Sequence, residues 1–330
     1  MTEKFMAFIV NKTEESFSAG MREISLDDLP EGEVTIQVAY SSVNYKDGLA
    51  SIPNGKIVRF YPFIPGIDLA GTVVSSTDHR FKEGDEVIAT SYELGVSHFG
   101  GFSQFARVPG DWVVPLPKGL TLKEAMIYGT AGFTAALSIQ RMEENGLKPE
   151  DGPVLVTGAT GGVGSMAVAM LSRLGYHVVA STGKESEHDY LRQLGAKEVL
   201  SREELSPEKI KPLDKQRWAG AIDPVGGNTL AYVLSTIKYG GSVASCGLTG
   251  GGEFSTSVYP FILRGINLLG IDSVYCPMVT RANLWNRMGS DLKPDDLDQA
   301  ANEITLEELP NILAAILKGQ VRGRTVVKIN

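Results

Sequence analysis

The stretch Val154-Leu-Val-Thr-Gly-Ala-Thr-Gly-Gly-Val-Gly164 decides the fold of this 330-residue chain. Its apolar start predicts a strand, the glycine-rich segment predicts a tight turn, and a helix is expected to begin near Ser165. That helix would end at Leu174-Gly175, where glycine suits the left-handed conformation after a helix, and His177-Val-Val-Ala predicts a second strand. Strand, glycine turn, helix and strand in this order are the context of a dinucleotide-binding fold.

The glycine turn predicts a binding site for a pyrophosphate. Glycines let the backbone approach the phosphates, whose charge meets the helix N-terminus, and Gly164 lets the helix pack closely on the strand. Ala159 departs from the simplest pattern, because it stands where the first glycine would be. Tight turns also use glycine for steric reasons alone, so the prediction depends on the flanking strands and helix. The expected cofactor contacts in this turn are Thr160, Gly161, Gly162, Val163 and Gly164.

The end of the second predicted strand favours NADPH as the cofactor. Enzymes that use NADH place Asp or Glu there to bind the ribose hydroxyls, whereas this chain has Ser181-Thr-Gly-Lys184. Hydroxyl donors and a lysine suit a 2′-phosphate, which an acid would repel. The alternative interpretation is an ordinary polar loop between a strand and a helix. The expected cofactor contacts in this segment are Ser181, Thr182, Gly183 and Lys184.

The chain changes character along its length. Short alternating or apolar runs between turn residues predict a mainly β-stranded start, and Thr121-Leu-Lys-Glu124 fits a capping box at a helix start. From Pro153 onward, apolar strands alternate with helical patterns, which is typical of βαβ units and a parallel sheet. Gly323-Arg-Thr-Val-Val-Lys-Ile predicts a closing strand. The strands expected in the second part are 154–157, 177–181, 198–200, 220–223, 242–246 and 267–271.

Composition and charge limit the class of partner. The formal net charge is −8 and is spread along the chain, which argues against a nucleic-acid-binding face because phosphates demand clustered Lys and Arg. No window approaches the ~18 apolar residues of a membrane helix, and the N-terminus lacks a signal-peptide pattern, so we expect a soluble cytoplasmic protein. The two cysteines and four histidines show no zinc spacing, and no metal site is expected.

Several separated motifs follow one another along the chain. They are Ser41-Ser-Val-Asn-Tyr-Lys-Asp47, Pro65-Gly-Ile-Asp-Leu-Ala-Gly-Thr-Val73, Phe81-Lys-Glu-Gly-Asp-Glu-Val87, Gly100-Gly-Phe-Ser-Gln-Phe-Ala106, Gly129-Thr-Ala-Gly-Phe-Thr134 and Asp223-Pro-Val-Gly-Gly227. Together they resemble the zinc-free quinone oxidoreductase branch of the medium-chain dehydrogenase/reductase superfamily. The resemblance covers essentially the whole chain in the right order, and the sequences of 44–47, 129–135 and 323–327 are most similar to the acrylyl-CoA reductase subgroup.

The resemblance implies an α/β fold in two domains. A GroES-like, mainly β catalytic domain would comprise residues 1–124 and 295–330, and a Rossmann domain with a doubly wound parallel sheet would comprise 125–294 and bind NADPH. Nicotinamide and substrate would lie in the cleft between them. The sixth strand, near Asn267–Tyr275, would pair across a homodimer.

The resemblance also bears on zinc. The alcohol dehydrogenase branch binds a catalytic zinc through Cys and a His-Glu pair, but the corresponding stretches here, Asn44-Tyr45 and Gly66-Ile-Asp68, hold neither Cys nor His. Without zinc, an alkoxide cannot be held as a metal-stabilised hydride donor. Reduction of an activated alkene or a quinone is therefore favoured over alcohol oxidation.

Hydride delivery to an enone, enoyl thioester or quinone places negative charge on a remote oxygen, which needs a hydrogen-bond donor. Tyr45 is the first candidate, as a donor or as a stacking partner of the nicotinamide, with Asn44 beside it. Asp47 would orient these groups, or serve only as a charge at a helix N-terminus or in a hydrogen bond within a loop. Thr130 and Thr134 would approach the nicotinamide, or act as plain helix caps.

Other candidates follow the later strands. Leu248 and Ser273 come after the fifth and sixth strands, at the carboxyl edge where ligands bind, and Arg324 is expected to contact a cofactor phosphate or an anionic substrate. Cys246 has no basic partner in the sequence and is interpreted as a small buried residue. A CoA phosphate could be attracted by surface lysines and an arginine, which otherwise have only a solvated role: Lys46, Lys56 and Arg59.

Three functions stay open. The first is NADPH-dependent reduction of an activated double bond, most specifically acrylyl-CoA to propionyl-CoA, and the second is NADPH-dependent quinone reduction. Both need an open hydride acceptor and no metal, so the sequence separates them poorly. The third is a non-catalytic NADPH-binding protein, against which Asn44, Tyr45 and the full glycine loop weigh.

Overall fold

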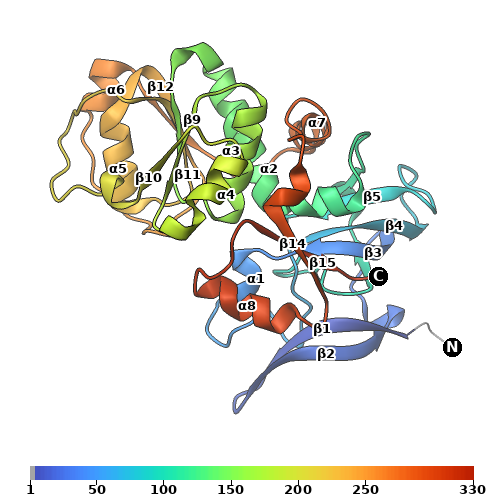
Figure 1. Cartoon of the computed structure of the whole chain (residues 1–330). Coiled ribbons are helices and arrows are strands. Elements are labelled where there is room, and N and C mark those ends of the chain that lie inside the picture. Colours follow the sequence, from blue (N-terminus) through green and yellow to red (C-terminus); the bar gives the residue numbers. More distant parts are fainter. Residues whose placement is uncertain (1–3) are drawn as a thin grey trace. The chain divides into compact units, whose positions relative to one another are not determined.

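The computed structural model describes residues 4–330, which form two compact units. The first contains the residues up to Thr130 together with Val274–Gly289 and Ala301–Asn330, and the second contains Ala131–Ser273 and Ser290–Ala300. Helix α2 (Leu122–Glu144) begins in the first unit and ends in the second (Figure 1). The sequence-based ranges placed the boundary at 124/125 and assigned 274–289 to the second domain, which differs from these units.

The first unit is built on two mainly antiparallel sheets, in which only the pair β14–β15 is parallel among the described residues. Among the described residues, β1 (Lys4–Lys12) and β2 (Phe17–Ser25) form a hairpin, and seven strands form a larger sheet in the order β14-β15-β3-β4-β5-β7, with β6 also paired to β3. Apolar side chains such as Phe8, Ile36, Leu69 and Phe102 form its core. The bounds in the larger sheet are β3 Val34–Ser42, β4 Asp68–Ser76, β5 Glu86–Thr90, β6 Phe105–Val108, β7 Val113–Pro115, β14 Ala301–Thr305 and β15 Arg324–Lys328.

The register of three strands gathers polar residues at one place. Strand β3 runs antiparallel to β4, with Ser41 opposite Leu69, and antiparallel to β15, with Val326 opposite Ser42. The last residue of β3 therefore lies beside the first residues of β4 and β15. The closing strand predicted from the sequence is confirmed as β15, and it lies inside the sheet between β14 and β3.

Three helices complete the first unit. Helix α1 (Tyr45–Ala50) follows β3 directly and packs against α8 (Leu309–Leu317). Helix α7 (Met278–Met288) belongs to this unit because its side chains reach the β-sheet loops, and the Tyr128 hydroxyl donates to the carbonyl of Met288 at 3.1 Å.

The second unit is a doubly wound α/β domain, as the sequence predicts. Its described strands form a six-stranded sheet in the order β10-β9-β8-β11-β12-β13, and every neighbouring pair is parallel. Figure 1 shows helices on both sides of this sheet. The strand order reverses between β8 and β11, which is where such sheets bind nucleotides. The bounds are β8 Val154–Val156, α3 Gly162–Arg173, β9 Val178–Thr182, α4 His188–Gln193, β10 Glu198–Ser201, β11 Trp218–Asp223, α5 Gly227–Thr236, β12 Ile237–Ser245, α6 Tyr259–Arg264 and β13 Asn267–Gly270.

No helix within residues 4–330 is both long enough and apolar enough to span a membrane.

Candidate active site

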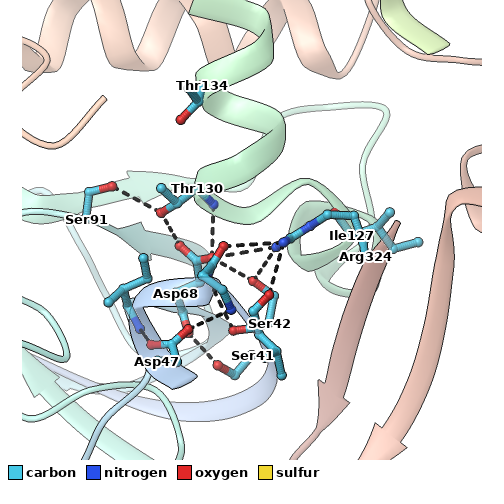
Figure 2. Close-up of polar contacts among 12 residues, drawn as sticks. Ser41, Ser42, Asp47, Asp68, Ser91, Ile127, Thr130, Thr134 and Arg324 are labelled. Atoms are coloured by element: carbon cyan, nitrogen blue, oxygen red, sulfur yellow. Dashed lines mark hydrogen bonds and ion pairs between the residues drawn. The ribbon is translucent and has the colours of Figure 1, made fainter. Parts of the chain in front are cut away.

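A buried carboxylate, Asp68, is the centre of a polar network in the first unit (Figure 2). Asp68 opens β4 and is 0% exposed. Its Oδ2 accepts hydrogen bonds from Ser42 Oγ at 2.6 Å, from Asn44 Nδ2 at 2.7 Å and from the backbone nitrogen of Thr130 at 2.9 Å. Its Oδ1 accepts from Thr130 Oγ1 at 2.5 Å. Both oxygens are therefore well supplied with donors, which is what an ionised buried carboxylate requires.

The guanidinium of Arg324 lies against the same carboxylate. Its Nη2 is 3.9 Å from Asp68 Oδ2 and donates to Ser42 Oγ at 2.9 Å. Its other nitrogens donate to Asn44 Oδ1 at 3.3 Å and to the carbonyl of Ile127 at 2.9 Å. The side chain is 2% exposed, so these donors point into the network rather than toward open solvent. This position is deeper than the ligand-facing one expected from the sequence.

Asn44 and Asp47 fix the start of α1 beside Asp68. The backbone nitrogen of Asn44 donates to Asp47 Oδ2 at 2.8 Å, and the backbone nitrogen of Ile67 donates to Asp47 Oδ1 at 3.0 Å. Burial, and then the nearby charge of Asp68, raise the pKa of Asp47 to about 7. Asp47 thus ties two chain segments together at the edge of the network.

Tyr45 differs from these neighbours because half of its side chain is exposed. Tyr45 is the first residue of α1 and is 50% exposed, and its hydroxyl forms no hydrogen bond to another residue in 4–330. Asn44, by contrast, is 9% exposed, and both ends of its amide are engaged by Asp68 and Arg324. Of the three candidates Asn44, Tyr45 and Asp47, Tyr45 is the one that is not buried and is available to a bound molecule.

Gly129 lets α2 approach the network. Its backbone has φ 50° and ψ −156°, a conformation inside α2 that favours glycine. A Cβ atom there would lie 2.5 Å from Asp68 Oδ2, 2.5 Å from Ser42 Oγ and 2.7 Å from Arg324 Nη2. A side chain would therefore push Thr130 away from Asp68.

The network extends beyond the residues that the sequence analysis named. Ser91 Oγ lies 3.1 Å from Thr130 Oγ1, and Figure 2 shows Ser91, Thr130 and Asp68 in a row. Sequence reasoning missed Ser42, Asp68 and Ser91 as site residues. The signal for Asp68 was a carboxylate beginning an otherwise apolar strand. Thr134, one turn further along α2, instead donates to Ser273 Oγ at 2.9 Å within the second unit.

The second unit has a pocket of about 590 Å³ at the carboxyl ends of its strands. Residues from the loops after β8, β9, β10 and β11 line it, and so do Thr249, Gly250 and Glu253. Of the residues expected to contact a cofactor, Thr160, Ser181, Thr182, Gly183 and Lys184 line this pocket.

The glycine turn has the geometry expected of a phosphate loop. Gly161 is the residue before α3, and Gly162 and Val163 form the first turn of that helix. A Cβ at Gly164 would lie 2.5 Å from the carbonyl oxygen of Gly158, which confirms that this glycine permits close packing of helix and strand. Leu248, in the loop after β12, is 68% exposed and adjoins the pocket residue Thr249.

Arg202 is the pocket residue that the sequence analysis missed. It follows β10, and its backbone nitrogen donates to the carbonyl of Thr182 at 3.0 Å. Its guanidinium lies over Gly183, since a Cβ at that glycine would be 2.0 Å from Arg202 Nη2. Neither Arg202 nor Lys184 forms a salt bridge within 4.0 Å in the described chain, so both charges are open to an anion. A basic residue directly after the third strand was the available signal.

A doubly wound nucleotide-type unit joined to a GroES-like β unit defines a class of dehydrogenases. Residues 30–118 match the family model for the alcohol dehydrogenase GroES-like domain, and residues 162–288 match the model for zinc-binding dehydrogenases. The chain belongs to the medium-chain dehydrogenase/reductase superfamily, a family of oxidoreductases.

Individual relatives match along the whole chain. The Bacillus subtilis protein YhfP, which has a provisional name as a quinone oxidoreductase, is 62% identical over 330 residues, 100% of both chains. The acrylyl-CoA reductase AcuI of Ruegeria pomeroyi is 52% identical over 99% of both. The crystal structure of YhfP with NAD bound has a TM-score of 0.97 and covers 99% of this chain and 100% of that one. The Salmonella enterica oxidoreductase YhdH in complex with NADP has a TM-score of 0.95 at 51% identity and covers 98% of this chain and 100% of YhdH.

The residues of the network do not suit a zinc ion, despite the name of the matching family model. Both oxygens of Asp68 already accept hydrogen bonds, and a guanidinium lies 3.9 Å away, where a divalent cation would be repelled. Within residues 4–330, no group of three or more His, Cys, Asp or Glu side chains could hold a metal ion. The positive charge beside Asp68 comes instead from Arg324.

Proposed function

We propose that this oxidoreductase is a zinc-independent, NADPH-dependent reductase that transfers a hydride to an activated double bond, with acrylyl-CoA to propionyl-CoA as the leading candidate. The observation that carries the cofactor choice is that two cations at the pocket of the second unit, Lys184 and Arg202, form no salt bridge within 4.0 Å among residues 4–330. The 52% identity to the acrylyl-CoA reductase AcuI supports the choice of acceptor.

NADPH fits this pocket better than NADH does on grounds of charge. The ends of β9 and β10 present Thr182, Lys184 and Arg202, and neither strand is followed at once by an acid. Thr182 Oγ1 accepts from the backbone nitrogen of Lys184 at 3.1 Å, which shapes the loop around the two cations. A 2′-phosphate would be held by charge-assisted hydrogen bonds. The NADP bound to YhdH agrees with this choice, whereas the NAD bound to YhfP is the reason to test it.

The remaining contacts to the cofactor are part of the same proposal. The N-terminal turn of α3, with Thr160, Gly161, Gly162 and Val163, would bind the pyrophosphate. Further contacts would come from Leu248, Ser273 and Thr130. Bound NADPH would supply the hydride.

The residues of the first unit would stabilise the negative charge that develops on the acceptor. We assign Tyr45 as the hydrogen-bond donor to the oxygen that gains negative charge, because the residue is 50% exposed and its hydroxyl is engaged by no residue in 4–330. The two donors of the Asn44 amide face Asp68 Oδ2 at 2.7 Å and the carbonyl of Ser42 at 3.5 Å, so we assign Asn44 and Asp47 to holding the start of α1 in place. Arg324 and Asp68 keep that scaffold rigid.

The test is a comparison of acceptors and cofactors in one assay. The oxidation of NADPH is followed with acrylyl-CoA and with a simple quinone in parallel, and both reactions are repeated with NADH. A higher specificity constant for acrylyl-CoA with NADPH is the expected result.

Quinone reduction with NADPH is the second candidate, favoured by the 62% identity to YhfP. Turnover of the quinone alone would select it. Cofactor binding without turnover of either acceptor would leave the chain as a non-catalytic NADPH-binding protein.

A further inference from the structure

Arg281, on α7 of the first unit, is a buried cation that contacts backbone oxygens and an aromatic ring. It is 0% exposed. Its Nη1 donates to Thr90 Oγ1 at 3.0 Å and to the Thr90 carbonyl at 3.4 Å, and its Nη2 donates to the carbonyl of Val274 at 3.1 Å. Its guanidinium carbon lies 4.6 Å from the centre of the Tyr92 ring. Arg281 therefore contacts both ends of the segment Thr90–Tyr92.

That segment has an unusual backbone. Ser91 has φ 67° and Tyr92 has φ 49°, so two consecutive residues with side chains adopt the left-handed conformation that favours glycine. Such a conformation persists only where the surroundings hold it, and it is concentrated at functional sites. Here the Tyr92 ring stacks on Trp112 at 5.7 Å with an interplanar angle of 6°, while Arg281 lies near its centre. The Tyr92 backbone nitrogen also donates to the Val274 carbonyl at 3.3 Å.

The strained turn presents Ser91 to the candidate active site. The backbone nitrogen of Ser91 donates to the carbonyl of Ile67, the residue before Asp68, at 2.9 Å. Thr130 Oγ1 gives its proton to Asp68 at 2.5 Å, so at 3.1 Å it can only accept from Ser91 Oγ. The result is an ordered row of donors, Ser91 to Thr130 to Asp68, visible in Figure 2.

We propose that Arg281 is a positioning residue for catalysis, which acts through Ser91. Arg281 stabilises the left-handed turn, and the turn places the Ser91 hydroxyl within hydrogen-bond distance of Thr130. The hydrogen bond from Ser91 then keeps Thr130 in its two hydrogen bonds to Asp68. The inference rests on the proposed function, because it assigns Arg281 an effect on turnover. It requires no contact between Arg281 and any ligand.

A double-mutant cycle between Arg281→Met and Ser91→Ala tests the proposal. Each single variant is expected to lower kcat about tenfold with the KM for NADPH unchanged, and the double variant is expected to be no slower than either. The matched control is Arg107→Met in the same unit, since Arg107 also donates to backbone carbonyls, those of Leu26 and Leu29, but is outside the network. Arg107→Met should lower thermal stability without lowering kcat, and it should not couple to Ser91→Ala.

Two results would overturn the proposal. The first is a double variant whose loss of kcat equals the product of the losses in Arg281→Met and Ser91→Ala, which would mean that the two residues act independently. The second is an equal kcat for Arg281→Met and Arg107→Met. If Arg281→Met does not fold, Tyr92→Leu takes its place in the double-mutant cycle, because it removes the ring that Arg281 contacts. If the wild-type protein reduces no acceptor, the proposed function fails first. The positioning role of Arg281 is then tested by hydrogen exchange at the Thr130 backbone amide. Arg281→Met should accelerate this exchange, and an unchanged rate would contradict the proposal that Arg281 holds Thr130 in place through Ser91.

Discussion

The carboxylate of Asp68 and the guanidinium of Arg324 lie 3.9 Å apart with both side chains buried, although the two residues open strands from opposite ends of the sequence. Removing one member of such a pair leaves an uncompensated charge in the interior, which costs about 3–5 kcal/mol. We therefore expect Arg324→Met to lower the free energy of unfolding by that order and to abolish turnover, as measured by denaturant unfolding and NADPH oxidation. Arg324→Lys should recover part of the stability only, because a lysine lacks the guanidinium fork. Full activity in Arg324→Met would contradict this role.

The two cations of the second-unit pocket are predicted to set cofactor choice. Lys184→Glu should weaken NADPH binding far more than NADH binding, and Arg202→Ser should weaken NADPH binding about tenfold, or ~1.4 kcal/mol, with little effect on NADH. Dissociation constants for both cofactors, measured by fluorescence titration, check this. Lys197→Ser is a control, since Lys197 precedes β10 and does not line the pocket. Equal losses of affinity for NADPH and NADH would contradict the proposal that these two cations bind the 2′-phosphate.

Removal of the Tyr45 hydroxyl is predicted to affect turnover rather than cofactor binding. Tyr45→Phe keeps the ring, so NADPH affinity should change little. Loss of one donor to a developing oxyanion lowers kcat by about a hundredfold. Steady-state kinetics together with an NADPH titration separate the two quantities. Unchanged kcat in Tyr45→Phe would mean that another group binds the oxygen.

Asp47 is predicted to make folding stability depend on pH. Burial, and then the charge of Asp68, raise its pKa to about 7 in the folded protein, whereas an unfolded Asp has a pKa of about 3.9. The folded state therefore holds a proton that the unfolded state has released. This contribution to stability is complete below about pH 4 and is lost as the pH rises through about 7. Thermal midpoints measured across that range should fall less with pH in Asp47→Asn than in the wild-type protein. Identical slopes would show that Asp47 does not titrate there.

The second unit is predicted to form a homodimer through β13 and α6. Strand β13 is an outer strand of the six-stranded sheet, and Ile262 and Leu263 on α6 are 68% and 57% exposed. An unpaired strand edge and exposed apolar side chains favour association with a second copy. Sedimentation should show a dimer that Ile262→Asp converts to a monomer. Val279→Asp, at an equally apolar residue that is 75% exposed on α7, should stay dimeric. A wild-type monomer would refute the prediction.

Sequence reasoning succeeded where structure is local. The segment from Val154 to Ala180 reads as strand, glycine turn, helix and strand because each step depends on near neighbours, and the structure confirms it as β8, α3 and β9. The capping box predicted at Thr121 is confirmed by hydrogen bonds between Thr121 and Glu124 in both directions, at 2.9 Å and 3.2 Å.

The Asp68 network could not be predicted in the same way. It joins Ser42, Asp68, Thr130 and Arg324, which meet because β3 pairs with β4 and with β15 in one register each and because Gly129 lets α2 approach. Nothing near any of these residues in the sequence specifies that register. Arg202 was missed for a related reason, since its proximity to Gly183 follows from the pairing of β10 with β9.

The position of β15 inside the sheet also governs the order in which the protein can mature. On one edge of β3, β6 pairs with Val34–Gln37, and Tyr40–Ser42 pairs with β15. Until the ribosome has released residues 324–328, that end of β3 is an open strand edge beside an uncompensated Asp68. Open edges invite pairing with other chains. The nascent protein therefore passes through a stage in which the strand edge beside the candidate active site is open to pairing with other chains.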